Sequence, residues 1–104
     1  MAVTLSQIDS DRLILYSRAG CCLCEGLEQK LRALNLEQLK RPLRLVVIDI
    51  DAPGCSPALK ARYDMQVPVL AVEGTELPRV SPRLSGDGLF RWLQRVCDSA
   101  TGSD

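Results

Sequence analysis

Two short apolar runs on either side of one amphipathic segment constrain the fold more than any other feature of this sequence. Leu13–Tyr16 (LILY) and Arg44–Ile50 (RLVVIDI) each have the length and the side chains of a buried strand. The segment between them predicts a helix from about Cys22 to Asn35, whose apolar face carries Leu23, Leu27, Leu31 and Leu34. Such a strand–helix–strand unit has parallel strands and a right-handed crossover. We expect the second strand to be buried on both faces of the sheet.

The remainder of the chain predicts two more helices and two more strands. Ser56 and Pro57 suit the start of a short helix over ALKARYDM. Strands at Val67–Val72 and Glu76–Val80 should form an antiparallel hairpin around a tight turn at Glu73-Gly74. Ser85 should cap a last helix over Gly86–Cys97, with Leu89, Trp92, Leu93 and Val96 on one face. The order β-α-β-α-β-β-α predicts an α/β fold with a four-stranded mixed sheet and helices on both faces.

Length and charge narrow the class of protein. With 104 residues, the chain is expected to form a single domain, 1–104, with an ordered core over about 12–97. Thirteen basic residues balance thirteen acidic ones, which argues against a nucleic-acid partner. No apolar segment approaches the ~20 residues of a membrane span, and no secretory signal is visible at the N-terminus. We therefore expect a cytoplasmic monomer with no membrane partner.

The cysteines carry the candidate chemistry. Three of the five lie within four positions of the stretch YSRAGCCLCE, between the first strand and the first helix. Because residues three apart lie on the same face of a helix, Cys21 and Cys24 should be neighbours. Cys22 is rotated from Cys21 by about 100° and should point elsewhere. The spacing therefore predicts a redox pair, Cys21-x-x-Cys24, since clustered cysteines in a reducing compartment are more often catalytic or metal-binding than structural.

Their positions along the helix suggest different roles for the two cysteines. Cys21 lies at the helix start, where unpaired N–H groups and the helix dipole favour a thiolate and should lower its pKa. Arg18 lies three residues upstream and is expected to add positive charge and to take part in substrate binding. Cys24 lies one turn inside the helix, where burial should keep its pKa higher. We therefore expect Cys21 to attack a substrate disulfide and Cys24 to resolve the mixed disulfide, with no metal or tightly bound cofactor.

Other interpretations of the cysteines remain open at this point. Cys97 fits a small buried apolar residue of the last helix, and Cys55 an incidental thiol in a polar loop. For Cys22, an inert side chain and a modulator of the pair are equally compatible with the sequence. The chain has no histidine, which excludes Cys-His catalysis and mixed Cys/His zinc sites. Zinc or an Fe–S cluster could still be held by clustered cysteines with Cys55 or glutathione. A redox-inert binding module is a further alternative.

Two segments of the chain resemble those of a known protein family. LILYSRAGCCLCEGLEQKL is similar to the opening of glutaredoxin-like proteins of the thioredoxin superfamily, in particular a small bacterial group that typically reads YSRPGCHLCE after its first strand. A second segment, ARYDMQVPVLAV, is similar to the family's Y-x-x-x-x-P-V-L stretch. The resemblance covers about Leu13 to Cys97 and implies a thioredoxin-like fold and thiol–disulfide exchange.

The resemblance also implies roles for residues far from the cysteines. It implies a cis peptide bond at Pro68 and a backbone at Val67 that pairs with an incoming peptide or glutathione. Glutathione or a disulfide-containing protein is the implied partner, and glutathione the possible co-substrate. The Gly-Gly pair that helps glutaredoxins to bind glutathione is absent from RVSPRLSGDG. Ser85 and Asp87 could contact a glutathione amino group, although both residue types are also common at helix starts.

Overall fold

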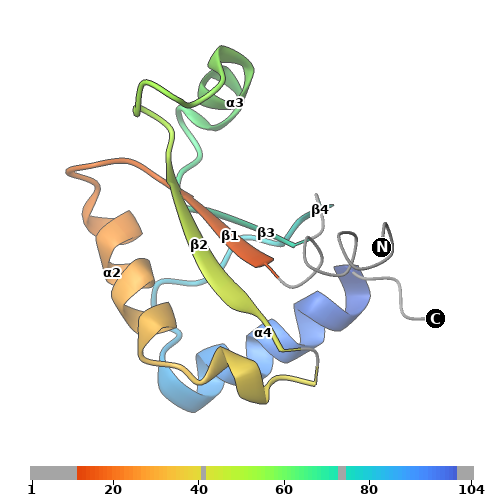
Figure 1. The fold of residues 1–104 in the computed structure, drawn as a ribbon. Helices are drawn as coiled ribbons and strands as arrows, with labels where there is room; N and C mark the ends of the chain where they lie inside the picture. The colour runs from red at the N-terminus through yellow and green to blue at the C-terminus, as the bar shows by residue number, and fades with distance from the viewer. Residues whose placement is uncertain (1–11, 41, 73–74, 101–104) are drawn as a thin grey trace, which may run out of the picture.

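The computed structural model describes residues 12–40, 42–72 and 75–100. Strand β1 (Arg12–Ser17) pairs in parallel with strand β2 (Arg44–Asp49), in a register that places Leu13 opposite Leu45. Helix α2 (Cys22–Arg32) and the short 3-10 helix η1 (Leu36–Gln38) form the connection between the two strands (Figure 1). The predicted strand–helix–strand unit is therefore present, with a helix that ends three residues earlier than expected.

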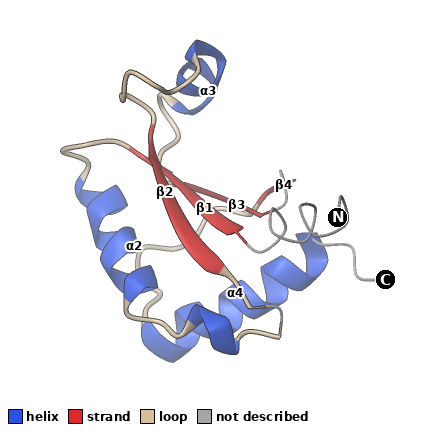
Figure 2. Cartoon of the chain, viewed as in Figure 1, coloured by secondary structure: helices blue, strands red, loops and turns tan. Residues whose placement is uncertain are grey.

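The second half of the chain completes the sheet. Helix α3 (Pro57–Tyr63) begins after Ser56, whose hydroxyl oxygen accepts a hydrogen bond from the N–H of Leu59 at 3.2 Å. Strands β3 (Val69–Val72) and β4 (Thr75–Glu76) are antiparallel, and the sheet order is β2-β1-β3-β4. Helix α4 (Gly86–Ala100) follows (Figure 2). The expected α/β fold with a mixed four-stranded sheet is confirmed.

The two strands of the hairpin are shorter than predicted. Strand β3 begins after Pro68, not at Val67, because a proline has no N–H to donate to a sheet ladder. Strand β4 ends at Glu76, where Glu76–Val80 was expected. The N–H of Leu77 still donates to the carbonyl of Leu70 at 2.8 Å, but residues 78–80 leave the sheet. The predicted turn at Glu73-Gly74 lies outside the described residues.

Helices α2 and α4 cover one face of the sheet. Strand β1 alternates between half-buried and buried side chains, and its buried residues Leu13 and Leu15 point into a large apolar core. Leu27 and Leu31 of α2 and Leu89 and Leu93 of α4 meet them there, with Trp92 and Val96 packed at the edge. None of the helices in the described ranges is long and apolar enough to cross a membrane.

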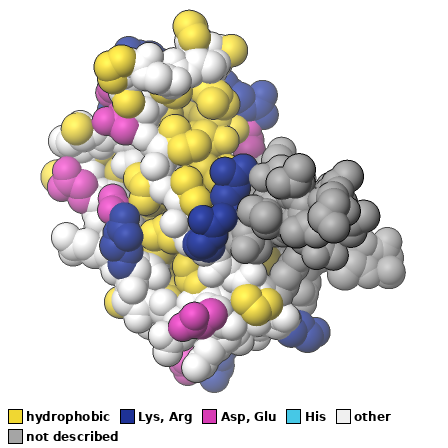
Figure 3. Space-filling model, in the orientation of Figure 1, with side chains coloured by type: hydrophobic (Ala, Val, Ile, Leu, Met, Phe, Trp, Pro, Cys, Tyr) yellow, Lys and Arg dark blue, Asp and Glu magenta, His cyan; other side chains and the backbone are white. Residues whose placement is uncertain are grey.

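Helix α3 covers only one end of the opposite face. A smaller cluster of Ile50, Tyr63 and Val69 lies beneath it, with Tyr16 and Leu59 packed alongside. The prediction that β2 is buried on both faces was wrong: all its residues are exposed or half-buried. The reason is that β2 is an edge strand, and α3 lies beyond its end. Figure 3 accordingly shows apolar side chains at the surface on the side where Figure 1 draws β2 in front.

Candidate functional site

The start of α2 brings Cys21 and Cys24 together. Gly20 precedes them with a φ of +82°, a left-handed conformation that suits glycine and turns the chain into the helix. Cys21 is the N-cap residue, and its sulfur accepts a hydrogen bond from the N–H of Cys24 at 3.1 Å. The two Cα atoms are 5.2 Å apart, and the sulfur atoms lie at disulfide-bonding distance. The structure thus places the predicted pair in the geometry of a dithiol–disulfide site.

The three clustered cysteines differ in exposure. Cys24 is fully buried beneath the helix start, Cys21 is half-buried, and Cys22 is exposed. A large external disulfide can therefore reach Cys21 more readily than Cys24. Capping by the N–H of Cys24 also favours negative charge on the sulfur of Cys21. Both observations agree with the predicted division of roles, which itself stays a prediction.

The other two cysteines lie away from this pair in different parts of the core. Cys97 is buried in the main apolar core, and Cys55 packs at the margin of the small cluster under α3. Among the residues that the structure describes, no three cysteine or carboxylate side chains are placed to share a metal ion. The structure thus offers no ready-made metal centre within the described ranges.

Arg18 makes contacts that the sequence interpretation did not foresee. Its guanidinium donates to both carboxylate oxygens of Asp51 at 2.8 and 3.0 Å. It also donates to the carboxylate of Asp64 at 2.7 Å and to the backbone carbonyl of Asp64 at 2.9 Å. The hydrogen bonds to Asp51, followed by the one to the Asp64 carboxylate, raise the pKa of Arg18. The hydrogen bonds from Arg18, followed by the one from Lys60, hold the pKa of Asp51 well below its ordinary value. Lys60 contacts Asp51 as well, at 3.1 Å.

The positive charge of Arg18 is therefore matched by carboxylates. Two cations and two anions make up the group, so its formal charge is zero and little positive field remains for Cys21. The hydrogen bonds of Arg18 instead join the loop before Cys21 to the segments on either side of α3. The carbonyl of Arg18 also accepts a hydrogen bond from the N–H of Cys21 at 3.3 Å. Asp51 and Asp64 were not singled out from the sequence, where they are separated from Arg18 by more than 30 residues.

The segment before β3 lies next to the same site. The Val67–Pro68 peptide bond is cis. The N–H of Val67 donates to the carbonyl of Tyr63 at 3.2 Å, which leaves the carbonyl of Val67 as the group that an incoming strand could use. The family resemblance implied that the backbone of Val67 pairs with a substrate. Its N–H is already bonded within the chain, to Tyr63.

Tyr63 anchors this segment to the sheet. Its ring stacks on Tyr16 with centroids 4.6 Å apart, and its hydroxyl donates to the carboxylate of Glu76 at 2.8 Å. Arg62 donates to the same carboxylate oxygen at 2.7 Å. Burial, followed by the hydrogen bond to Glu76, raises the pKa of Tyr63, whereas the two donors lower the pKa of Glu76. The network fixes the end of α3 against β4, and so fixes the start of the Val67–Pro68 turn.

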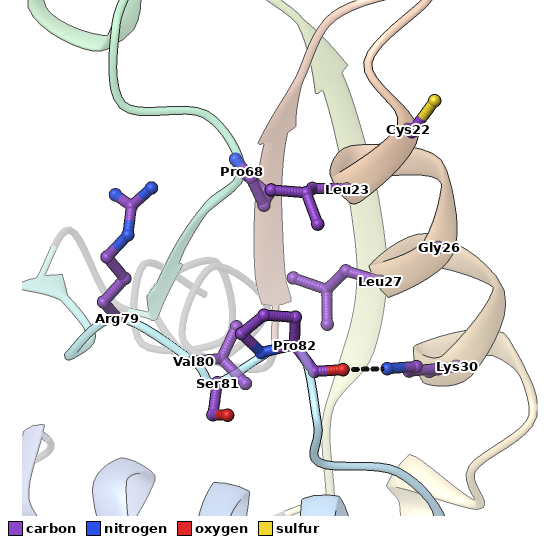
Figure 4. A pocket seen from close by; sticks show the side chains of 10 residues that line it. All are labelled: Cys22, Leu23, Gly26, Leu27, Lys30, Pro68, Arg79, Val80, Ser81 and Pro82. Atoms are coloured by element: carbon purple, nitrogen blue, oxygen red, sulfur yellow. Dashed lines mark hydrogen bonds between the residues drawn. The ribbon is translucent and has the colours of Figure 1, made fainter.

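A pocket of about 300 Å³ opens beside the dithiol (Figure 4). Cys22, Leu23 and Leu27 line it from α2, Pro68 lines it from the turn before β3, and residues 79–82 form the opposite wall. Leu23 was predicted to be part of the buried helix face, but it is 57% exposed and lines this pocket instead (Figure 4). The wall at residues 79–82 could not be found from the sequence, where residues 79–80 were expected to end a strand.

Ser85 and Asp87 flank the start of α4. The carbonyl of Ser85 accepts the N–H of Leu89 at 3.3 Å, so Ser85 stands directly before the first turn, as predicted. Asp87 is exposed and lies 3.6 Å from Arg91, one turn along the helix. Neither residue lines the pocket beside the dithiol.

Comparison with known proteins agrees with this geometry. Residues 12–94 match the family model of the glutaredoxin-like domain, DUF836. Uncharacterized proteins of Mycobacterium bovis and of two Mycobacterium tuberculosis strains are 31% identical over 62 residues. These matches cover 60% of this chain and 63% of each relative's own length. A crystal structure of Trxlp from Edwardsiella tarda has the same fold, with a TM-score of 0.57 at 22% identity over 90% of this chain and 92% of that one.

Proposed function

This chain belongs to the family of glutaredoxin-like domains, and we propose that it is a thiol–disulfide oxidoreductase acting on protein or glutathione disulfides. Cys21 is its nucleophile and Cys24 its resolving cysteine. The observation that carries the proposal is the pair itself: two cysteines at disulfide-bonding distance, one half-buried at a helix N-cap and one fully buried beneath it.

The first step is attack on a substrate disulfide. The Cys21 thiolate, stabilised by the N–H of Cys24 and by the helix N-terminus, attacks one sulfur of the substrate. A bond forms between Cys21 and that sulfur, the substrate disulfide breaks, and the first substrate thiolate leaves. Cys21 is the attacking cysteine in this proposal because a substrate disulfide can reach it, whereas Cys24 has no exposed surface in the structure.

The second step releases the product. Deprotonated Cys24 attacks the sulfur of Cys21, the Cys21–Cys24 disulfide forms, and the second substrate thiolate leaves. The substrate gains two electrons and the dithiol loses two, so each cycle needs an external dithiol or glutathione as reductant. The chain needs no resident cofactor or metal for this chemistry. A reducing compartment such as the cytoplasm would keep the dithiol form in supply.

Substitution of each cysteine in turn tests the proposal. With a peptide disulfide as substrate, Cys21→Ser should abolish reduction, and Cys24→Ser should accumulate a mixed disulfide on Cys21. Cys22→Ser is the matched control and should retain reduction, because Cys22 is exposed and outside the pair. Mass mapping of the trapped species identifies the bonded sulfur. A folded wild type without reductase activity, or a mixed disulfide trapped on Cys22, would show that the assignment is wrong and would favour a redox-inert module.

A further inference from the structure

We propose that the pocket beside the dithiol selects substrates, and that it takes an apolar side chain next to a carboxylate group in the peptide that carries the target disulfide. This inference rests on the proposed function, since it names the substrate class of the same site. Its occupant is a segment of a partner protein, with one apolar and one acidic residue near the cysteine.

The apolar half of the proposal comes from the pocket wall. Leu23 and Leu27 of α2 face Val80 and Pro82 across the pocket (Figure 4). Leu23 is a large aliphatic side chain that folding leaves 57% exposed. A partner side chain seated against it would remove apolar surface from water on both molecules, which favours binding. A volume of about 300 Å³ is at the lower limit of ligand sites and suits one side chain and its neighbour.

The acidic half of the proposal comes from two cations that form no ion pair with a carboxylate of the described residues. Lys30 donates to the backbone carbonyl of Pro82 at 2.6 Å, and Arg79 donates to that of Gln66 at 3.2 Å. Both side chains line the pocket. Among the described residues, no ion pair joins either one to a carboxylate, whereas Arg18, Arg32 and Arg62 each have one within 3 Å. A pocket with two unmatched positive charges is complementary to an anion.

The location of the pocket ties its occupant to the reaction. Cys22, between the two redox cysteines in sequence, lines the same pocket as Pro68. A peptide held there would therefore present its neighbouring residues to Cys21. Glutathione carries carboxylates but no apolar side chain, so it would leave Leu23 exposed. The pocket chemistry thus favours a protein substrate over glutathione.

Binding of redox-inert peptides tests the preference separately from turnover. Three fluorescently labelled peptides, with serine in place of cysteine, would carry leucine beside two aspartates, leucine beside two lysines, or alanine beside two aspartates. Oxidised protein is titrated against each. We expect the leucine–aspartate peptide to bind about tenfold tighter than the leucine–lysine peptide, a ratio that corresponds to ~1.4 kcal/mol. Its advantage should shrink as salt is added.

Variants then assign the preference to the pocket. Arg79→Gln should weaken the acidic peptide about three- to fivefold, as expected for loss of one exposed ion pair. Arg79→Lys should retain most of the affinity. The matched control is Arg95→Gln, which makes the same change in net charge at an exposed position of α4 outside the pocket. Leu23→Ser should erase the difference between the leucine and alanine peptides.

Three results would overturn the inference. These are equal affinity for all three peptides, equal effects of Arg79→Gln and Arg95→Gln, and glutathione displacing the acidic peptide at concentrations below the peptide's own dissociation constant. Turnover of matching peptide disulfides separates the two proposals. Reduction without a preference for the acidic apolar peptide would contradict this inference and leave the proposed function standing. Selective binding without reduction would contradict the proposed function and leave the binding preference standing.

Discussion

The helices on the two sides of the dithiol loop are held to the sheet by different kinds of interaction. Helix α2 is fixed by apolar packing, since Leu27 and Leu31 lie in the main core with the buried residues of β1 and α4. Helix α3 has a much smaller apolar cluster, built on Tyr63. Its position depends in addition on charged hydrogen bonds, from Arg18 before it and Arg62 within it.

Cys21 and Cys24 differ in how they are held in the same way as the two helices. Cys24 is a fully buried residue of α2, whereas Cys21 ends the loop that Arg18 joins to the segments around α3. Packing in a dense core depends little on protonation or on charge screening, whereas exposed ion pairs weaken in acid and at high salt. Cys24 is therefore held firmly by packing, whereas Cys21 is held by contacts that acid or high salt can loosen.

The largest effect is expected from truncation on the packed side. Leu31→Ala should lower the free energy of unfolding by about 2–5 kcal/mol, because Leu31 is fully buried and its removal leaves a cavity. Leu59→Ala, at the margin of the small cluster, should cost less. Urea denaturation measures both. Equal losses would mean that the two helices are equally well packed, which would contradict the difference described above.

A smaller effect is expected from the hydroxyl of Tyr63. Tyr63→Phe keeps the ring stacked on Tyr16 and removes the hydrogen bond to Glu76, so it should cost about 0.5–1.5 kcal/mol. Tyr16→Phe is the matched control, since no hydrogen bond joins the Tyr16 hydroxyl to another described residue. Denaturant midpoints of the two variants should differ. If they coincide, the hydrogen bond to Glu76 does not help to hold α3.

The charged contacts predict how stability depends on pH. Because hydrogen bonds from Arg18 and then Lys60 lower the pKa of Asp51 in the folded state, the ionised carboxylate stabilises the fold above its ordinary pKa of 3.8. That contribution is lost as the pH falls below this value. Asp51→Asn should therefore be less stable than the wild type at neutral pH, and the difference should shrink in acid.

Thermal unfolding between pH 7 and pH 2.5 measures this difference. Asp87→Asn serves as the control, since its carboxylate is largely exposed and lies 3.6 Å from Arg91. It should follow the wild type across the range. An Asp51→Asn curve parallel to that of the wild type would show that the contacts of Arg18 contribute nothing that depends on charge.

The smallest effect is expected at the third clustered cysteine. Cys22→Ser changes an exposed side chain and should alter stability by no more than about 0.5 kcal/mol. Formation of the Cys21–Cys24 disulfide should be unchanged, since both partners keep their positions. Differential scanning fluorimetry and mass mapping of the oxidised protein check the two expectations. A shifted pairing pattern would mean that Cys22 competes with Cys24.

Local sequence patterns were sufficient for most of the fold. The apolar run at Leu13–Tyr16, the leucine spacing that follows and the Ser56-Pro57 helix start each act over a few residues, and all three correspond to observed elements. The pairing of Cys21 with Cys24 was equally accessible, because a separation of three positions places two side chains on the same face of a helix start. Local patterns were therefore enough to predict the order of the elements and the Cys21–Cys24 pair.

Contacts between residues far apart in the sequence determine the surroundings of the cysteine pair. Arg18 meets Asp51 and Asp64 only because β1, β2 and α3 end at the same place, and no local pattern encodes that meeting. Burial also depends on the whole molecule: Leu23 follows the spacing of a core residue, yet it lines the pocket and remains exposed. The pocket joins α2 to residues 79–82, about 50 positions away, so its apolar wall and its two cations exist as a site only after folding.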